Sequence, residues 1–157
     1  MPRRARVQRR TILPDPIYAN VGVAKFVNCL MLRGKKSVAE GIVYSAFERI
    51  RRSSRSREPL DIFEQAMRNV TPILEVKPKR VGGATYQVPV EIRHDRRQAL
   101  ARRWIIRYAR ARSGRSMSDK LAAELMDAAN GMGASVKRKE DTHKMAESNK
   151  AFSHFRY

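Results

Sequence analysis

The segment KPKRVGGATYQVPVEIR, residues 77–93, constrains the fold more than any other part of the chain. Two runs that can form strands flank the glycine pair at 82–83, and glycines can adopt the positive φ angles of a tight reversal. The second run alternates in polarity, and its apolar face carries Tyr86, Val88, Val90 and Ile92. Pro78 and Pro89 cannot donate to a sheet ladder, which disfavours the centre of a larger sheet. The sequence therefore predicts a lone β-hairpin, over residues 72–92, that leans on helices at its base and carries a cationic tip.

Helical periodicity organises the rest of the chain. The expected helices cover about residues 20–33, 37–50, 59–70, 96–111, 116–130 and 134–150. The predicted fold is mainly α: a compact bundle of about six helices with one extended β-hairpin between the third and fourth. Residues 1–16 are expected to form a basic N-terminal arm, 17–150 the helical domain and 151–157 a C-terminal tail.

Three local signals set the expected helix starts. Ser37 and Glu40 have the spacing of a capping box, in which each side chain satisfies a backbone N–H of the new helix. Pro59 suits the first turn of the third helix, and Ser116 resembles the N-cap of the fifth.

The charge balance indicates the class of partner. The chain of 157 residues has 34 Lys and Arg against 15 Asp and Glu, a formal net charge of +19. Such a surplus is costly in self-repulsion unless a polyanion neutralises it. Basic residues occur on several unconnected elements, which suits a folded RNA. The alternative is an architectural DNA-binding protein whose hairpin enters the minor groove.

The expected helix over 96–111 has two contrasting faces. The predicted apolar arc, with Trp104 as its core anchor, carries Leu100, Ala101, Trp104, Ile105 and Tyr108. The opposite arc carries Arg96, Arg103, Arg107 and Arg110. From residue 93 to 112 only Asp95 opposes the arginines, so this arc is expected to face nucleic acid.

No constellation of residues predicts catalysis, a cofactor or a metal site. Cys29 is the only cysteine, so neither a disulfide framework nor a multi-cysteine zinc site is possible. His94, His143 and His154 lie in different elements and lack metal-ligand spacing. No apolar run approaches the ~20 residues of a membrane span. These features predict a soluble, intracellular non-enzyme.

The C-terminal tail AFSHFRY is rich in aromatic side chains. Its expected partner residues are Phe152, His154, Phe155 and Tyr157. Aromatics at a terminus suggest docking onto a protein neighbour or stacking on bases, and packing back onto the domain is the alternative.

Several sequence motifs, taken together, are specific enough to indicate a protein family. They are an arginine-rich start, DPIY near Asp15, GKKS from Gly34, KRVGGATYQVP in the hairpin, RRQALARRWI from Arg96, SMSDKLAAELMDAA from Ser116 and KMAESNKAFSHFRY at the end. Over nearly its whole length the chain resembles the bacterial and plastid form of the small-subunit ribosomal protein seven family. Ala84, Arg102 and Ser148 depart from residues that are common in that family.

The resemblance implies a structural constituent of the small ribosomal subunit, in a bacterial cytoplasm or a plastid stroma. It implies a primary binder of the 3′ major domain of small-subunit ribosomal RNA that nucleates assembly of the head. Neighbouring ribosomal proteins of the head and platform would be further partners, with no membrane partner and no homo-oligomer. Near the exit-site tRNA and the mRNA path it would place Lys79, Arg80, Val81, Gly82 and Gly83.

Charge pattern and resemblance together give the expected residues at the ribosomal RNA. They are Arg3, Arg4, Arg6, Arg9, Arg10, Lys25, Lys35, Lys36, Lys77, Lys79, Arg80, Arg93, Arg96, Arg97, Arg103, Arg107 and Arg110.

Overall fold

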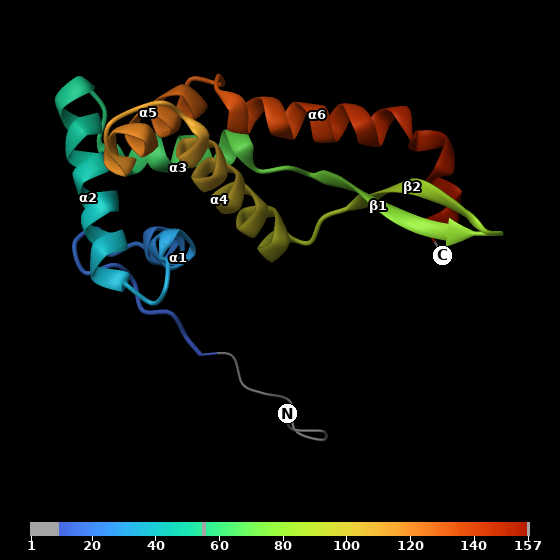
Figure 1. Cartoon of the computed structure of the whole chain (residues 1–157), viewed down its shortest axis with the longest axis horizontal. Helices are drawn as coiled ribbons and strands as arrows, with labels where there is room; N and C mark the ends of the chain where they lie inside the picture. The colour runs from blue at the N-terminus through green and yellow to red at the C-terminus, as the bar shows by residue number, and fades with distance from the viewer. Residues whose placement is uncertain (1–9, 55, 157) are drawn as a thin grey trace. The chain divides into compact units, whose positions relative to one another are not determined.

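The computed structural model describes residues 10–54 and 56–156 and divides the chain into two compact units, with the boundary after Glu40. The described elements, in chain order, are α1 (Val21–Leu30), α2 (Lys36–Ser53), α3 (Pro59–Val70), β1 (Leu74–Val81), β2 (Ala84–Glu91), α4 (His94–Ala111), α5 (Met117–Ala129), α6 (Ala134–Ser148) and the 3₁₀ helix η1 (Lys150–Arg156) (Figure 1). The prediction of a mainly α fold with a hairpin between the third and fourth helices is confirmed.

The first unit contains α1, which begins at a side-chain cap. Asn20 Oδ1 accepts hydrogen bonds from the backbone N–H groups of Gly22 (2.6 Å) and Val23 (3.3 Å), two of the donors that a helix start leaves unpaired. The helix ends at Leu30, earlier than expected, because Met31 has an extended backbone conformation. Its buried side chains are Val23, Phe26, Val27 and Leu30.

The predicted capping box of α2 is wrong. Arg33 and Gly34 both have positive φ, and α2 begins at Lys36, so Ser37 lies inside the first turn rather than at the N-cap. The Glu40 carboxylate lies 3.7 Å from Lys36 Nζ, one helical turn away. The start of α2 is therefore set by the chain reversal at Arg33 and Gly34, and not by the S-x-x-E spacing.

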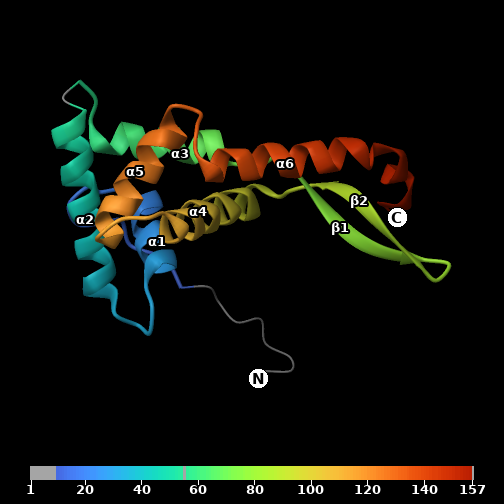
Figure 2. The same cartoon turned by 45° about the horizontal axis from the view of Figure 1, so that its top comes forward.

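The second unit places α3, α4 and α5 around an apolar core (Figure 2). Phe47 of α2 and Phe63 of α3 are buried, and their ring centroids lie 5.8 Å apart. The buried side chains of α3 and α5 include Ile62, Phe63, Ala66, Val70, Leu121, Ala122, Leu125 and Ala128. Ser116 Oγ accepts from the Asp119 N–H at 3.2 Å, which confirms the predicted N-cap of α5.

The core-facing stripe of α4 differs from the predicted one. Its buried residues are Ala101, Ile105, Ile106 and Ala109, whereas Leu100, Trp104 and Tyr108 are only partly buried. Trp104 is therefore not a fully buried core anchor. The stripe is turned by roughly one residue, because small alanines let the helix axis approach α5 while the large aromatics fit at the edge.

An ionic cluster around the buried Glu124 joins the C-terminal end of α4, α5 and the start of α6. Glu124, 1% exposed, accepts from Arg112 Nη1 at 2.6 Å and from the Ser135 backbone N–H (3.1 Å) and Oγ (2.6 Å). The Arg112 guanidinium also donates to Asp127. Burial alone would lower the pKa of Arg112, but its hydrogen bonds to Asp127 and Glu124 outweigh that effect and raise it. Gly133 has φ +93, and a Cβ there would lie 3.3 Å from Glu124 Oε1, so the loop before α6 requires glycine.

The hairpin has the predicted glycine turn. Antiparallel pairing runs from Leu74 opposite Glu91 to Val81 opposite Ala84. Gly82 and Gly83 form the two-residue turn, with φ +57 and +88.

The hairpin leans on a helix at its root, as predicted, and η1 also lies against its second strand. Val88 and Ile92 are each 2% exposed. β1 lies beside α6, and β2 beside η1 (Figures 1 and 2). At its root the Ile73 N–H donates to His143 Nε2 of α6 at 3.0 Å.

Acidification is expected to weaken this root. The Ile73 bond requires an unprotonated Nε2, and burial, with Lys139 nearby, lowers the pKa of His143 below its ordinary 6.5. A depressed folded-state pKa means that the contribution to stability is complete above about pH 6.5 and is lost as pH falls through the lowered value. Urea titrations across this range should show a fall in the free energy of unfolding toward acid.

His143→Gln keeps an acceptor and cannot titrate, so it should remove that part of the pH dependence. His94→Gln, at an exposed position on α4, is the matched control and should retain it. An unchanged pH profile in His143→Gln would contradict the assignment.

Candidate nucleic-acid interface

The tip of the hairpin is an open cationic surface. Lys77 and Arg80 are exposed and Lys79 is partly buried; Lys79 lies opposite Tyr86 in the register. A Cβ added at either turn glycine would meet no atom within 4 Å. Backbone and cations can therefore approach a polyanion closely at this end.

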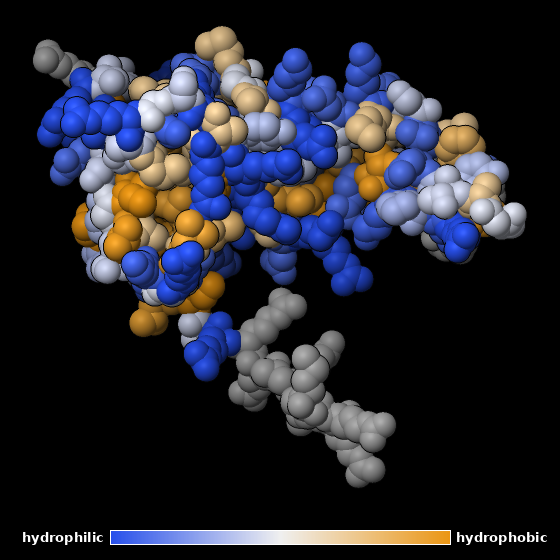
Figure 3. All heavy atoms as spheres, viewed as in Figure 1, coloured by the Kyte–Doolittle hydropathy of each residue, from blue (hydrophilic) through white to orange (hydrophobic). Residues whose placement is uncertain are grey.

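The second cationic surface is a row of arginines on α4. We call Arg103, Arg107 and Arg110 the α4 arginine row; all three are exposed. Separations of four and three residues place them on one side of the helix. Hydrophilic side chains cross the middle of the face in Figure 3, where Figure 1 places α4.

Arg96 and Arg97, also predicted at the RNA, have structural partners. Arg96 Nε and Nη2 donate to the Glu75 carboxylate of β1 at 2.8–3.0 Å, and Lys77 Nζ lies 3.4 Å from the same group. Burial raises the pKa of Glu75, but the hydrogen bonds and charges of Arg96 and Lys77 more than offset this and hold the pKa below 4.5. Arg97 Nε donates to the Ile92 carbonyl at 2.6 Å.

Both arginines therefore fix the hairpin root to α4. Sequence reasoning missed Glu75, 9% exposed. The available signal was a single acid in an otherwise basic strand.

The remaining predicted cations belong to other parts of the chain. In the first unit Arg10, Lys35 and Lys36 are exposed and Lys25 is partly buried. Arg93, just before α4, is exposed. Arg3, Arg4, Arg6 and Arg9 lie outside the described residues.

The tail contacts its own domain. The Phe152 ring centroid lies 5.2 Å from that of Tyr86 on β2, with the ring planes tilted by 46°. His154 is exposed, and its Nδ1 lies 2.8 Å from the Ala151 carbonyl oxygen. Tyr157 and the side chain of Phe155 lie outside the described part of the chain. Part of the Phe152 ring therefore packs on β2. Packing back onto the domain was the alternative to docking on a partner.

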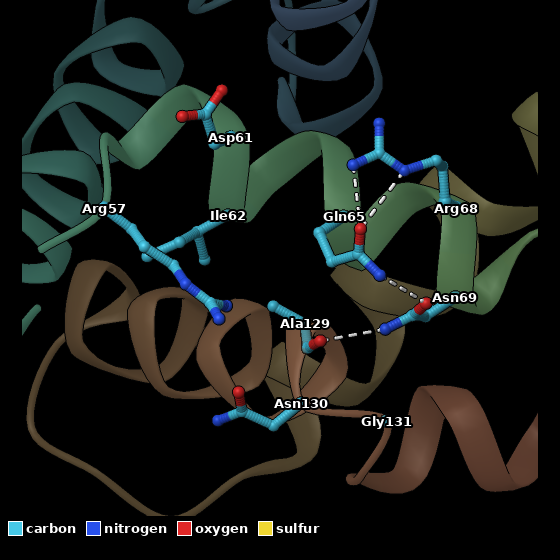
Figure 4. A pocket seen from close by; sticks show the side chains of 9 residues that line it. All are labelled: Arg57, Asp61, Ile62, Gln65, Arg68, Asn69, Ala129, Asn130 and Gly131. Atoms are coloured by element: carbon cyan, nitrogen blue, oxygen red, sulfur yellow. Dashed lines mark hydrogen bonds between the residues drawn. The ribbon is translucent and has the colours of Figure 1, made fainter.

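A polar pocket of about 630 Å³ lies between α3 and the end of α5 (Figure 4). Gln65 accepts from Arg68 (2.8 and 3.2 Å) and donates to Asn69 (3.0 Å). Asn69 Nδ2 in turn donates to the Ala128 and Ala129 carbonyls at 2.8 and 2.9 Å. The chain of bonds satisfies the C-terminal carbonyls of α5, so it joins two helices, and no predicted site residue lines it.

The described residues support neither metal binding nor membrane spanning. No group of three or more His, Cys, Asp or Glu among them could hold a metal ion. None of the described helices combines the length and the apolarity that crossing a membrane requires.

Comparison with known proteins identifies the family. The family described as Ribosomal protein S7p/S5e matches residues 2–150. The chain is 63% identical to the small ribosomal subunit protein uS7 of Carboxydothermus hydrogenoformans and 60% identical to those of Moorella thermoacetica and Thermoanaerobacter pseudethanolicus. Each alignment spans 157 residues and covers 100% of both chains. The chain therefore belongs to the Ribosomal protein S7p/S5e family and is a structural, non-enzymatic constituent of the small ribosomal subunit.

Proposed function

We propose that this protein binds small-subunit ribosomal RNA through the α4 arginine row and the cationic hairpin tip. One observation carries the proposal: an exposed row of guanidinium groups on a helix whose sequence after Asp95 contains no acid. A solvated helix usually interleaves acids that pair with its bases one turn away. An unbalanced row instead suits a phosphate backbone.

The family resemblance supports the following proposal for where this binding occurs in the subunit. The RNA element is the 3′ major domain, and binding there nucleates assembly of the head. The open hairpin tip, with Lys79 and Arg80, lies near the exit-site tRNA and the mRNA path. The C-terminal end approaches a neighbouring ribosomal protein.

Phosphate contacts supply most of the affinity in this mechanism, and the shape of the folded RNA supplies the selectivity. Each phosphate that a cation neutralises releases counterions, so binding weakens steeply as salt rises. Arg96 and Arg97 contribute indirectly, because their bonds to Glu75 and Ile92 fix the hairpin root.

Removing the α4 arginine row tests the proposal. The triple variant Arg103→Ala, Arg107→Ala, Arg110→Ala should bind the 3′ major domain RNA at least about tenfold more weakly, with a log K against log salt slope shallower by about two to three. Far-UV circular dichroism and the melting temperature should change little, because these side chains are exposed.

A second triple variant distinguishes the effect of this particular site from the effect of net charge. Arg51, Arg52 and Arg68 are also exposed, and each lies within 3.5–3.9 Å of a carboxylate oxygen. Replacing all three by alanine removes the same formal charge and should weaken binding less. Equal losses in the two triples would show that only net charge acts. Equal affinity for duplex DNA and folded RNA at matched salt would favour the DNA-binding alternative.

A further inference from the structure

The distal half of the hairpin, residues 79–87, needs support that its own strands do not provide. A two-stranded ribbon in water is at best marginally stable. Its turn consists of two glycines, which lose much conformational freedom on ordering. Pro78, at its edge, has no N–H to donate across the strands.

The contacts at the root do not reach this half. The Ile73 bond to His143 and the Glu75 pair with Arg96 hold the first residues of β1 and the segment before it. Val88 and Ile92 are buried on the returning strand, and both lie on the root side of Tyr86. From residue 79 to 86 the strands continue past these anchors.

The tail meets the hairpin beyond the anchors. η1 follows α6 and lies against β2 (Figure 1). Phe152, partly buried, packs its ring at 5.2 Å on Tyr86, and Tyr86 lies directly across from Lys79. The aromatic contact therefore acts on the residue pair that carries Lys79, one of the three cations of the tip.

We propose that η1 positions the hairpin tip, and that Phe152 on Tyr86 is the contact through which it does so. Lys79 and Arg80 are then presented from a ribbon that is held at both its root and its distal half. A partner that drew the tail off β2 would loosen the tip, and by linkage a ligand that ordered the tip would hold the tail on β2. This positioning is a property of the free protein and does not depend on the proposed RNA binding.

Hydrogen exchange on the isolated full-length protein tests the inference. In Phe152→Ala, the protected backbone amides of residues 79–87 should exchange about three- to tenfold faster, the effect of losing one aromatic pair on a local opening. Amides of α3 and α5 should keep their rates. Phe152→Trp, which keeps an aromatic ring, should retain most of the protection.

Two further variants make the result specific. Met132→Ala truncates an exposed apolar side chain in the turn before α6 and should leave the hairpin unchanged. Tyr86→Ala should reproduce the effect of Phe152→Ala, and the double variant should exchange little faster than either single one. Unaltered exchange at 79–87 in Phe152→Ala, with the helices intact, would overturn the inference. Fully additive effects of the two substitutions would also overturn it, because the rings would then act separately.

Discussion

Replacing Glu124 by alanine is expected to lower the free energy of unfolding by about 2–4 kcal/mol, because it leaves the buried N–H and hydroxyl of Ser135 without their acceptor and opens a cavity. The carboxylate is 1% exposed and accepts from both Arg112 and Ser135. Its loss leaves a guanidinium group without one of its acceptors and a buried hydroxyl and backbone N–H without theirs. Urea titration followed by circular dichroism measures the change.

Two controls separate the charge from the shape. Glu124→Gln keeps the size of the side chain and an oxygen for Ser135 but loses the charge facing Arg112, so it should destabilise the protein by less than alanine does. Glu147→Ala removes an exposed carboxylate from α6 and should stay within about 0.5 kcal/mol of the parent. Similar small losses in all three variants would contradict the role given to the cluster.

The cluster around Glu124 also fixes how the end of α4, α5 and the start of α6 are arranged relative to one another. Arg112 follows α4, Glu124 lies in α5 and Ser135 in the first turn of α6. Three elements therefore share one carboxylate, and α6 leaves the bundle at an angle that those bonds fix. Since α6 carries His143 and leads into η1, the same bonds help to set where the hairpin is held.

Local signals predicted the elements that local chemistry determines. Gly82 and Gly83 marked a two-residue turn, and the observed pairing closes on them. Pro59 marked the first residue of α3, and Ser116 the cap of α5. In each case the backbone conformation depends on residues within a few positions in sequence.

Contacts between distant residues could not be predicted in the same way. Glu75 and Arg96 are 21 positions apart, and Ile73 and His143 are 70 apart. The sequence around each of these residues does not indicate which distant residue it contacts. For this reason Arg96 and Arg97 were expected at the RNA, and the predicted contact between the hairpin base and the helices could not be assigned to particular residues.

Periodicity gave the right helices but not the rotation of each one. On α4 it favoured Trp104, whereas Ile106 is buried at 3% exposure. Both residues are apolar, so the sequence contains no local reason to prefer one arc over the neighbouring one. The choice depends on the surface of α5, where small residues allow close approach.

The buried face of α3 gives the second large expected effect. Phe63→Ala should lower the free energy of unfolding by about 3–5 kcal/mol, because it removes a ring that is 3% exposed and packed against Phe47. Removing the buried ring leaves a cavity that a close-packed core fills only in part.

A matched pair of substitutions on the same helix tests which of its faces is buried. Ile62 is 5% exposed, whereas Leu60 is only partly buried. Each loses the same number of carbon atoms on substitution by alanine. Ile62→Ala should therefore cost about 2–4 kcal/mol, and Leu60→Ala about 1–2 kcal/mol. Chemical denaturation of the two variants under identical conditions gives the comparison. If Leu60→Ala proved the more damaging, the burial assigned to Ile62 and Leu60 on α3 would be wrong.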